Sequence, residues 1–299
     1  MNLKLQKKFI DMTKKANNPT ESLKIPRFII LSCKICALIS TKLVTRYAAR
    51  LFTTPVKHKV PKRELEMDRN SSQKSIFVNA IKKSIVVYEY GKSDRKILLV
   101  HGWSGRGTQL FKIADEVIKE GYSTISFDAP AHGKSHGQTT IMSDFIEAIL
   151  EIDKKYGPFE IAIGHSLGGM SVLNAMKSGL QVKKAIVIGS GDIVQDILDD
   201  FIAKLSLKPE IGIQLRNLFE NKYQTKMNDY SAYVAAQKIK IPVLVIHDED
   251  DPEVPVQASI HINDHLENGS LFLTQGLGHR KILGNQNVIK KVIDFIKTN

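Results

Sequence analysis

Cysteine is scarce in this chain of 299 residues, which contains only Cys33 and Cys36. Two cysteines cannot form the several bridges of a small secreted scaffold, and a structural zinc site needs about four ligands. The sequence therefore predicts no disulfide framework and no metal site, and it fits a reducing compartment. We expect both thiols to be small apolar side chains of a helix, as free cysteines commonly are.

An uninterrupted apolar stretch long enough to cross a bilayer is also missing. The most apolar run, Phe28 to Val44, is interrupted by Lys34 and Lys42. A lysine near the bilayer centre costs about 3 kcal/mol. Residues 1–27 are mixed in character, whereas a secretory signal starts with a short basic segment followed directly by its apolar core. We expect neither a membrane-spanning helix nor a secretory signal, and we predict a cytoplasmic protein.

Acidic residues are almost absent from the first part of the chain. Residues 1–63 hold 15 Lys and Arg but only Asp11 and Glu21, whereas residues 64–299 hold 28 basic and 29 acidic side chains. The formal charge of +12 therefore belongs to an N-terminal arm. Because the body is nearly neutral, we do not expect nucleic acid as a partner.

Two interpretations of this basic arm stay open. The run Phe28 to Val44, predicted as one helix, could lie on an anionic membrane surface with Arg27, Lys42, Arg46 and Arg50 beside it. Alternatively, the helix packs on the body with its bases in solvent. The first interpretation predicts peripheral membrane association through residues 1–63.

A linker follows the arm. Thr53 to Glu64 carries two prolines and five bases but little apolar content, which is typical of a connecting segment. We predict a basic helical arm and linker over residues 1–73 and a body over residues 74–299.

Short runs rich in Val, Ile and Leu alternate with segments of helical period in the body. Residues 75–80 and 84–91 are typical of a hairpin. Six later runs lack polar alternation, as expected of strands buried on both faces of a parallel sheet: "KILLVHG", "YSTISFDAP", "EIAIGHS", "KKAIVIGSG", "PVLVIHDED" and "GSLFLTQG". The sequence predicts an α/β fold with a mostly parallel central sheet of about eight strands and helices on both faces.

One interval interrupts this alternation. Asp192 to Lys240 separates two predicted strands, and its runs "IVQDILDDFIAKL" and "IGIQLRNLFE" have helical spacing. Structureless loops of this length are uncommon in compact domains. We therefore predict a small helical insertion at about 192–240, placed as a lid.

A candidate nucleophile lies in "AIGHSLGGMS", where Ser166 ends a predicted strand and precedes a predicted helix. This is the setting of a nucleophile elbow, a strained strand-to-helix turn in which Gly164 and Gly168 leave room for close backbone packing. The start of the helix also favours developing negative charge. Ser166 is the predicted nucleophile.

A serine needs a base, and His279 is the best placed of nine histidines. It follows the last predicted strand on a glycine-rich loop, at the carboxyl edge of the sheet where such folds bind ligands. We expect His101 and His132 to shape loops, and His165 to point away from the serine.

The base needs an orienting carboxylate, and "HDEDDPEVP" offers several after the strand that precedes it. Asp251, before the turn-forming Pro252, is the preferred candidate. Asp250 is the alternative, and Asp192 is a second one at the same edge of the sheet. We expect the other acids of this cluster to be solvated.

The oxyanion of an acyl-transfer intermediate requires two preorganised donors. The backbone N–H of Leu167, directly after the candidate nucleophile, is one. The other is expected from "HGWSGRG", at the N–H of Trp103. No phosphate-binding glycine motif follows a strand, so we expect no nucleotide and no organic cofactor.

Residues 74–298 resemble the α/β-hydrolases. The resemblance rests on the ordered motifs "HGWSG", "FDAPAHGKS", "GHSLGG", "HDEDDPEVP" and "GLGHR", and on the chain order of Ser166, Asp251 and His279. Asp248 stands where the family often has glycine. Arg280 replaces a more usual apolar residue and is expected to contact the substrate or the acid cluster.

The motifs predict a serine hydrolase that acts on a small acyl substrate, with a carboxylic ester as the expected class. The same fold also supports thioesterases, lipases and peptidases, because specificity lies outside the core. A binding protein that retains the fold without catalysis is the alternative from another class.

Overall fold

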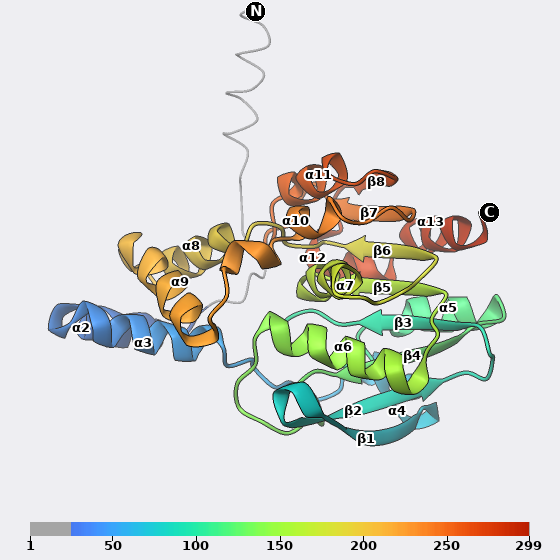
Figure 1. Cartoon of the computed structure of the whole chain (residues 1–299), viewed down its shortest axis with the longest axis horizontal. Helices are drawn as coiled ribbons and strands as arrows, with labels where there is room; N and C mark the ends of the chain where they lie inside the picture. Colours follow the sequence, from blue (N-terminus) through green and yellow to red (C-terminus); the bar gives the residue numbers. More distant parts are fainter. Residues whose placement is uncertain (1–24, 299) are drawn as a thin grey trace, which may run out of the picture.

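The computed structural model describes residues 25–298, which include one sheet of eight strands (Figure 1). The strands lie in the order β1-β2-β4-β3-β5-β6-β7-β8. β2 pairs antiparallel with β1 and β4, and the other neighbours are parallel. The strands are β1 Ser72–Val78, β2 Lys83–Tyr90, β3 Lys96–Val100, β4 Ser123–Asp128, β5 Ile161–His165, β6 Lys184–Ile188, β7 Val243–Asp248 and β8 Gly269–Thr274. The predicted α/β fold is confirmed.

Helices cover both faces of the sheet, because alternate side chains of each strand point to opposite sides. In β3, Leu98 and Val100 join one hydrophobic cluster, and Ile97 and Leu99 join the other. Helices α6, α7, α10 and α11 lie on the first face, and α5 and α13 on the second. Their bounds are α5 Phe111–Lys119, α6 Met142–Tyr156, α7 Leu167–Lys177, α10 Ala232–Ala236, α11 Val256–Asp264 and α13 Gln286–Lys297.

The helical insertion predicted at about 192–240 is present between β6 and β7. It consists of α8 (Val194–Lys204), α9 (Glu210–Tyr223), η3 (Met227–Tyr230) and α10. Helices α8 and α9 project from the carboxyl edge of the sheet, where the arrows of the parallel strands point (Figure 1). Short helical turns complete the fold: η2 Asn79–Ile81, α12 Gly278–Lys281 and η4 Ile282–Gly284.

The arm contains two helices, so the prediction of one helix over Phe28 to Val44 is wrong. α2 (Arg27–Ile39) ends and α3 (Thr41–Phe52) begins at Ser40, whose backbone is extended (φ −163°, ψ 131°). The Ser40 hydroxyl accepts a hydrogen bond from the N–H of Leu43 and caps α3. Because a cap competes with helix continuation, the apolar run bends here.

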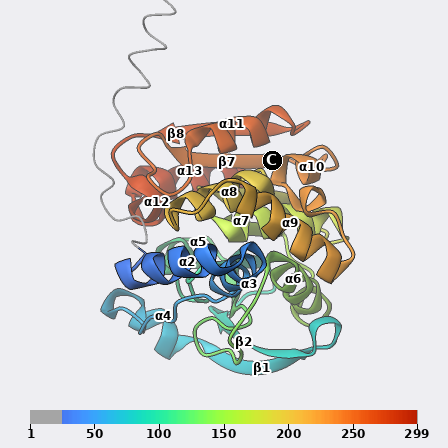
Figure 2. The same ribbon diagram turned by 90° about the vertical axis from the view of Figure 1, so that its left-hand side faces the viewer.

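Helices α2 and α3 pack against the insertion. Their inner sides share one hydrophobic cluster with α8 and α9, whose buried members are Cys33, Val44, Ala48, Leu198, Ile202, Leu205, Ile211, Leu215 and Phe219. We call α2, α3, α8 and α9 the cap, which Figure 2 shows in front of the sheet. Cys33 is a free, apolar helix residue as expected, and burial raises the pKa of its thiol to about 11.

The segment predicted as a linker lies against the body. The N–H of Val56 donates to Ser104 Oγ at 3.0 Å. Beyond it come η1 (Lys62–Glu64) and α4 (Leu65–Asn70). The buried Glu64 carboxylate accepts hydrogen bonds from Arg106 and Thr108, both at 2.8 Å. These contacts cross the division predicted at residue 73, which stays a prediction.

The helices of the described chain are too short or too polar to cross a bilayer: none between residues 25 and 298 meets both requirements.

Candidate active site

Ser166 lies on a sharp turn between β5 and α7. Its backbone adopts φ 55° and ψ −123°, a strained conformation for a residue with a side chain. A Cβ on Gly164 would lie 2.4 Å from the carbonyl oxygen of Gly168, and a Cβ on Gly168 would lie 2.4 Å from that of Val100. Only glycine fits at both positions, so the strand and helix can approach closely enough to form this turn.

Asp251 and His279 lie together at the carboxyl edge of the sheet. Asp251 follows β7, and His279 lies in α12; His279 Nδ1 and Asp251 Oδ2 are 2.6 Å apart. The other oxygen, Oδ1, accepts the N–H groups of Glu253 (2.8 Å) and Val254 (3.0 Å). Burial raises the pKa of Asp251, but the hydrogen bond and charge of His279 and these N–H groups hold it below its usual value. The carboxylate is thus ionised and fixed in orientation.

The two alternative acids have other partners. Asp250 Oδ2 accepts the N–H of Gly276 at 2.9 Å. Asp192 Oδ2 lies 2.5 Å from Nδ1 of His261, and its Oδ1 accepts the N–H of Tyr233. The structure thus brings Asp251, and neither alternative, to His279.

Two acids of the same cluster are buried or partly buried, which contradicts the expectation that they are solvated. Asp248 is fully buried and accepts the N–H groups of Leu277 and Gly278 and the hydroxyl of Thr274. It holds the loop that carries His279. Glu253 is the second, with a side chain that is 18% exposed.

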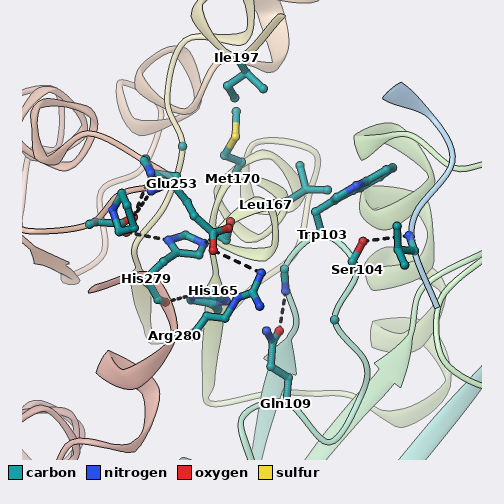
Figure 3. A pocket seen from close by; sticks show the side chains of 18 of the residues that line it. Trp103, Ser104, Gln109, His165, Leu167, Met170, Ile197, Glu253, His279 and Arg280 are labelled. Atoms are coloured by element: carbon teal, nitrogen blue, oxygen red, sulfur yellow. Dashed lines mark hydrogen bonds and ion pairs between the residues drawn. The ribbon is translucent and has the colours of Figure 1, made fainter. Parts of the chain in front are cut away.

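Glu253 occupies a position that the sequence analysis did not foresee. Its Oε2 lies 3.9 Å from His279 Nε2, and its Oε1 lies 3.3 Å from the Arg280 guanidinium (Figure 3). Arg280 thus contacts the acid cluster, one of its two expected partners. Within the described residues, Ser166 makes no hydrogen bond to His279. Nε2 of His279 therefore faces the carboxylate of Glu253 and is not hydrogen-bonded to Ser166.

The loop after β3 passes directly beside Ser166. A Cβ on Gly102 would lie 2.9 Å from Ser166 Cβ, so this approach requires glycine. Trp103 and Leu167 line the same cavity as Ser166 (Figure 3). Neither of their N–H groups donates to another group of the described chain. For Leu167 this follows from its place at the start of α7, where helix N–H groups have no internal acceptor.

Buried histidines fix this loop in place. His101 Nε2 accepts the N–H of Ala129, and His132 Nε2 accepts the N–H of Ser104, each at 3.0 Å. Burial lowers the pKa of His132 to about 4 and holds that of His101 well below its usual value. Both rings are therefore neutral acceptors near neutral pH, and both have the loop-shaping contacts expected of them.

His165 supports the base rather than the serine. Its Nε2 lies 2.9 Å from the His279 carbonyl oxygen, and the two ring centres are 4.6 Å apart. Burial lowers the pKa of His165 to about 3, so the ring is neutral and donates one hydrogen bond to the backbone of His279. Asp128, the acid at the end of β4, accepts the N–H of Gly107 in the loop after β3 and the N–H of Lys134 in the loop after β4. It thus joins these two loops.

A cavity of about 1630 Å³ lies between the edge of the sheet and the cap. Ser166 and His279 line it. Apolar side chains from the arm and the insertion line it as well: Ile29, Leu51, Phe52, Ile197 and Phe201. The arm is thus part of the cavity wall. Across residues 25–298, no cluster of three or more His, Cys, Asp or Glu side chains is arranged to hold a metal ion.

The model of the alpha/beta hydrolase family matches residues 97–286, more than half of the chain. The chain belongs to this family. The matched residues of this α/β-hydrolase include every motif of the site, from the loop after β3 to His279.

Solved structures share the fold of this α/β-hydrolase at low sequence identity. An esterase from Exiguobacterium antarcticum is 17% identical with a TM-score of 0.60, and the match covers 76% of this chain and 100% of the esterase chain. A putative lipase from Acinetobacter baumannii is 19% identical with a TM-score of 0.60, and the match covers 80% of this chain and 96% of the lipase chain. Alpha/beta hydrolase domain-containing protein 10 from mouse is 19% identical with a TM-score of 0.59, and the match covers 75% of this chain and 96% of the mouse chain. No curated protein matches the sequence.

Proposed function

We propose that this α/β-hydrolase is a serine hydrolase that cleaves carboxylic esters through an acyl-enzyme. One observation carries the proposal: Ser166, on its strained turn, shares a cavity with a buried His279–Asp251 pair whose atoms are 2.6 Å apart. A serine, a base and an oriented carboxylate are the groups that nucleophilic acyl transfer needs. The esterase and the putative lipase of the same fold support the reaction class only by analogy.

In the proposed reaction, Ser166 Oγ attacks the ester carbonyl carbon while His279 Nε2 takes the hydroxyl proton. Asp251 stabilises the imidazolium, and the N–H groups of Trp103 and Leu167 hold the carbonyl oxygen, which has become an oxyanion. The carbonyl re-forms, the bond to the alkoxy oxygen breaks, and His279 returns the proton to the leaving alcohol. Water then repeats the sequence and releases the acid and free Ser166.

The Ser166–His279 hydrogen bond must form in the substrate complex, because the free protein does not have it. Such bonds often tighten only when substrate binds. The size of the cavity and its apolar walls favour an ester with an apolar acyl group.

Labelling with a fluorophosphonate probe tests the proposal. We expect the wild-type protein to be labelled at Ser166 and the Ser166→Ala variant to lose both labelling and hydrolysis of p-nitrophenyl esters, with kcat lower by about 10⁴-fold or more. Ser178→Ala, on the exposed end of the same helix, is the matched control and should keep both. A folded wild-type protein that is not labelled at Ser166 would contradict serine catalysis.

A further inference from the structure

The outward side of α2 carries a stripe of exposed apolar side chains. Phe28, Leu31, Ile35, Leu38 and Ile39 follow one another at helical spacing and share one side. Leu38 is 88% exposed and Phe28 is 72% exposed. Half of the exposed large apolar side chains in residues 25–298 lie on this one helix. We call these five residues the outer face of α2.

The opposite side of α2 packs against the other three helices of the cap. Cys33 is completely buried among side chains of α3, α8 and α9. Ser32 Oγ and the Tyr47 hydroxyl, 3.1 Å apart, tie α2 to α3. The packing therefore fixes which side of α2 points outward. Within residues 25–298 these five side chains stay exposed, and a contiguous exposed apolar patch marks an interaction site.

The segment that carries this outer face is basic and contains no acidic residue. Residues 25–63 contain nine Lys and Arg and no Asp or Glu. Arg27 and Lys34 are exposed on α2 and border the apolar stripe, as their helical spacing requires. Lys42 and Arg46 are exposed on α3. The partner of such a surface combines negative charge with an apolar phase.

We propose that the outer face of α2 docks on an anionic lipid surface. The helix has 13 residues, which gives a length of about 20 Å, shorter than the hydrocarbon core of a bilayer. It therefore lies in the plane of the interface, with its apolar stripe among the acyl chains and its bases at the headgroups. Its inner side stays packed against α3, α8 and α9.

Charge favours a lipid surface over a second copy of this chain. Two outer faces placed together would bring Arg27 and Lys34 of one copy against the same bases of the other, with no acid in residues 25–63 to compensate. Nucleic acid would satisfy the bases but would leave Leu38 and Phe28 against a polar surface.

Docking would also place the hydrolase site beside the lipid. Ile25 and Pro26, at the start of α2, and Ile29, in its first turn, line the cavity that contains Ser166. The docking itself does not depend on catalysis. The inactive Ser166→Ala variant is therefore expected to bind lipid as the wild type does, which separates this proposal from the proposed function.

Co-sedimentation of the full chain with vesicles tests the docking. We expect binding to vesicles made of equal parts phosphatidylcholine and phosphatidylglycerol, and much weaker binding to phosphatidylcholine alone. Leu31→Gln/Leu38→Gln should weaken binding to the anionic vesicles by at least about tenfold. Arg27→Gln/Lys34→Gln should weaken it by about fivefold for each base removed.

Matched variants elsewhere on the surface are the controls. Phe77→Gln and Ile213→Gln change exposed apolar side chains of β1 and α9, and Lys92→Gln changes an exposed base on the turn between β2 and β3. These should bind as the wild type does. Equal binding by Leu31→Gln/Leu38→Gln and wild type would overturn the proposal. So would light scattering that shows a wild-type dimer which this double variant converts to a monomer.

Discussion

At the residue scale, neighbouring carboxylates of one loop have different tasks. Asp248 accepts the N–H groups of Leu277 and Gly278, Asp250 accepts the N–H of Gly276, and Asp251 faces His279. The order of residues along the chain favoured this loop, with Asp192 as an alternative outside it. It could not separate the members of the loop, because which carboxylate reaches His279 depends on the backbone direction at each one. Nothing in the local sequence predicted that the carboxylate of Glu253 would lie near His279 Nε2.

The assignment of the acid predicts unequal effects of two adjacent substitutions. Asp251→Asn should lower kcat for p-nitrophenyl esters by about 10⁴-fold, because the imidazole then loses the partner that sets its tautomer and stabilises its charge. Asp250→Asn, one residue away and exposed, should stay within a few-fold of the wild type. Steady-state kinetics on folded protein measures both. If Asp250→Asn is the more damaging change, Asp251 is not the acid.

At the scale of elements, the helices of the cap were visible in the sequence, but their association was not. Helical period identified α8, α9 and an apolar arm helix, because period is a local property of side-chain spacing. That α2 and α3 pack on α8 and α9 depends on matching surfaces far apart in the chain. The break at Ser40 was missed because the apolar run continues through it.

Because α2 and α3 share a hydrophobic cluster with α8 and α9, we expect a destabilising substitution in α9 to loosen the arm as well. Leu215→Ala, at a fully buried position, should lower the free energy of unfolding by about 2 to 5 kcal/mol or unfold the cap alone. Amide exchange should then rise in residues 41–52 as well as in 194–223. Ile213→Ala, 49% exposed on the same helix, should change neither. Exchange that rises only in α9 would show that the arm is held independently.

At the scale of the whole molecule, the site is built on neutral buried histidines. His101, His132 and His165 have lowered pKa values because burial disfavours the charged ring. Unfolding exposes these rings to water, where their pKa returns to about 6.5. The unfolded chain therefore takes up protons at a higher pH than the folded one.

This difference predicts a loss of stability in mild acid. The contribution of His132 is complete above about pH 6.5 and is lost as pH falls toward about 4, a decrease of about 3 kcal/mol for this residue. Urea unfolding at a series of pH values measures it, and His132→Gln should flatten the curve in that window. Buried Asp128, with its raised pKa, acts in the opposite direction, so the comparison with the wild type isolates His132. His58→Gln, at an exposed position, should leave the slope unchanged.

The sequence alone determined the α/β class, the eight strands, the helical insertion and the placing of Ser166 between a strand and a helix. These follow from short-range properties: continuous apolar runs, helical period, and glycines where the backbone must approach closely. The tertiary structure decided which carboxylate meets His279 and that Glu253 faces the other side of the ring. It also decided that the arm lines the cavity while the outer face of α2 points outward. Those features join residues distant in the chain, and only the packing of the whole fold brings them together.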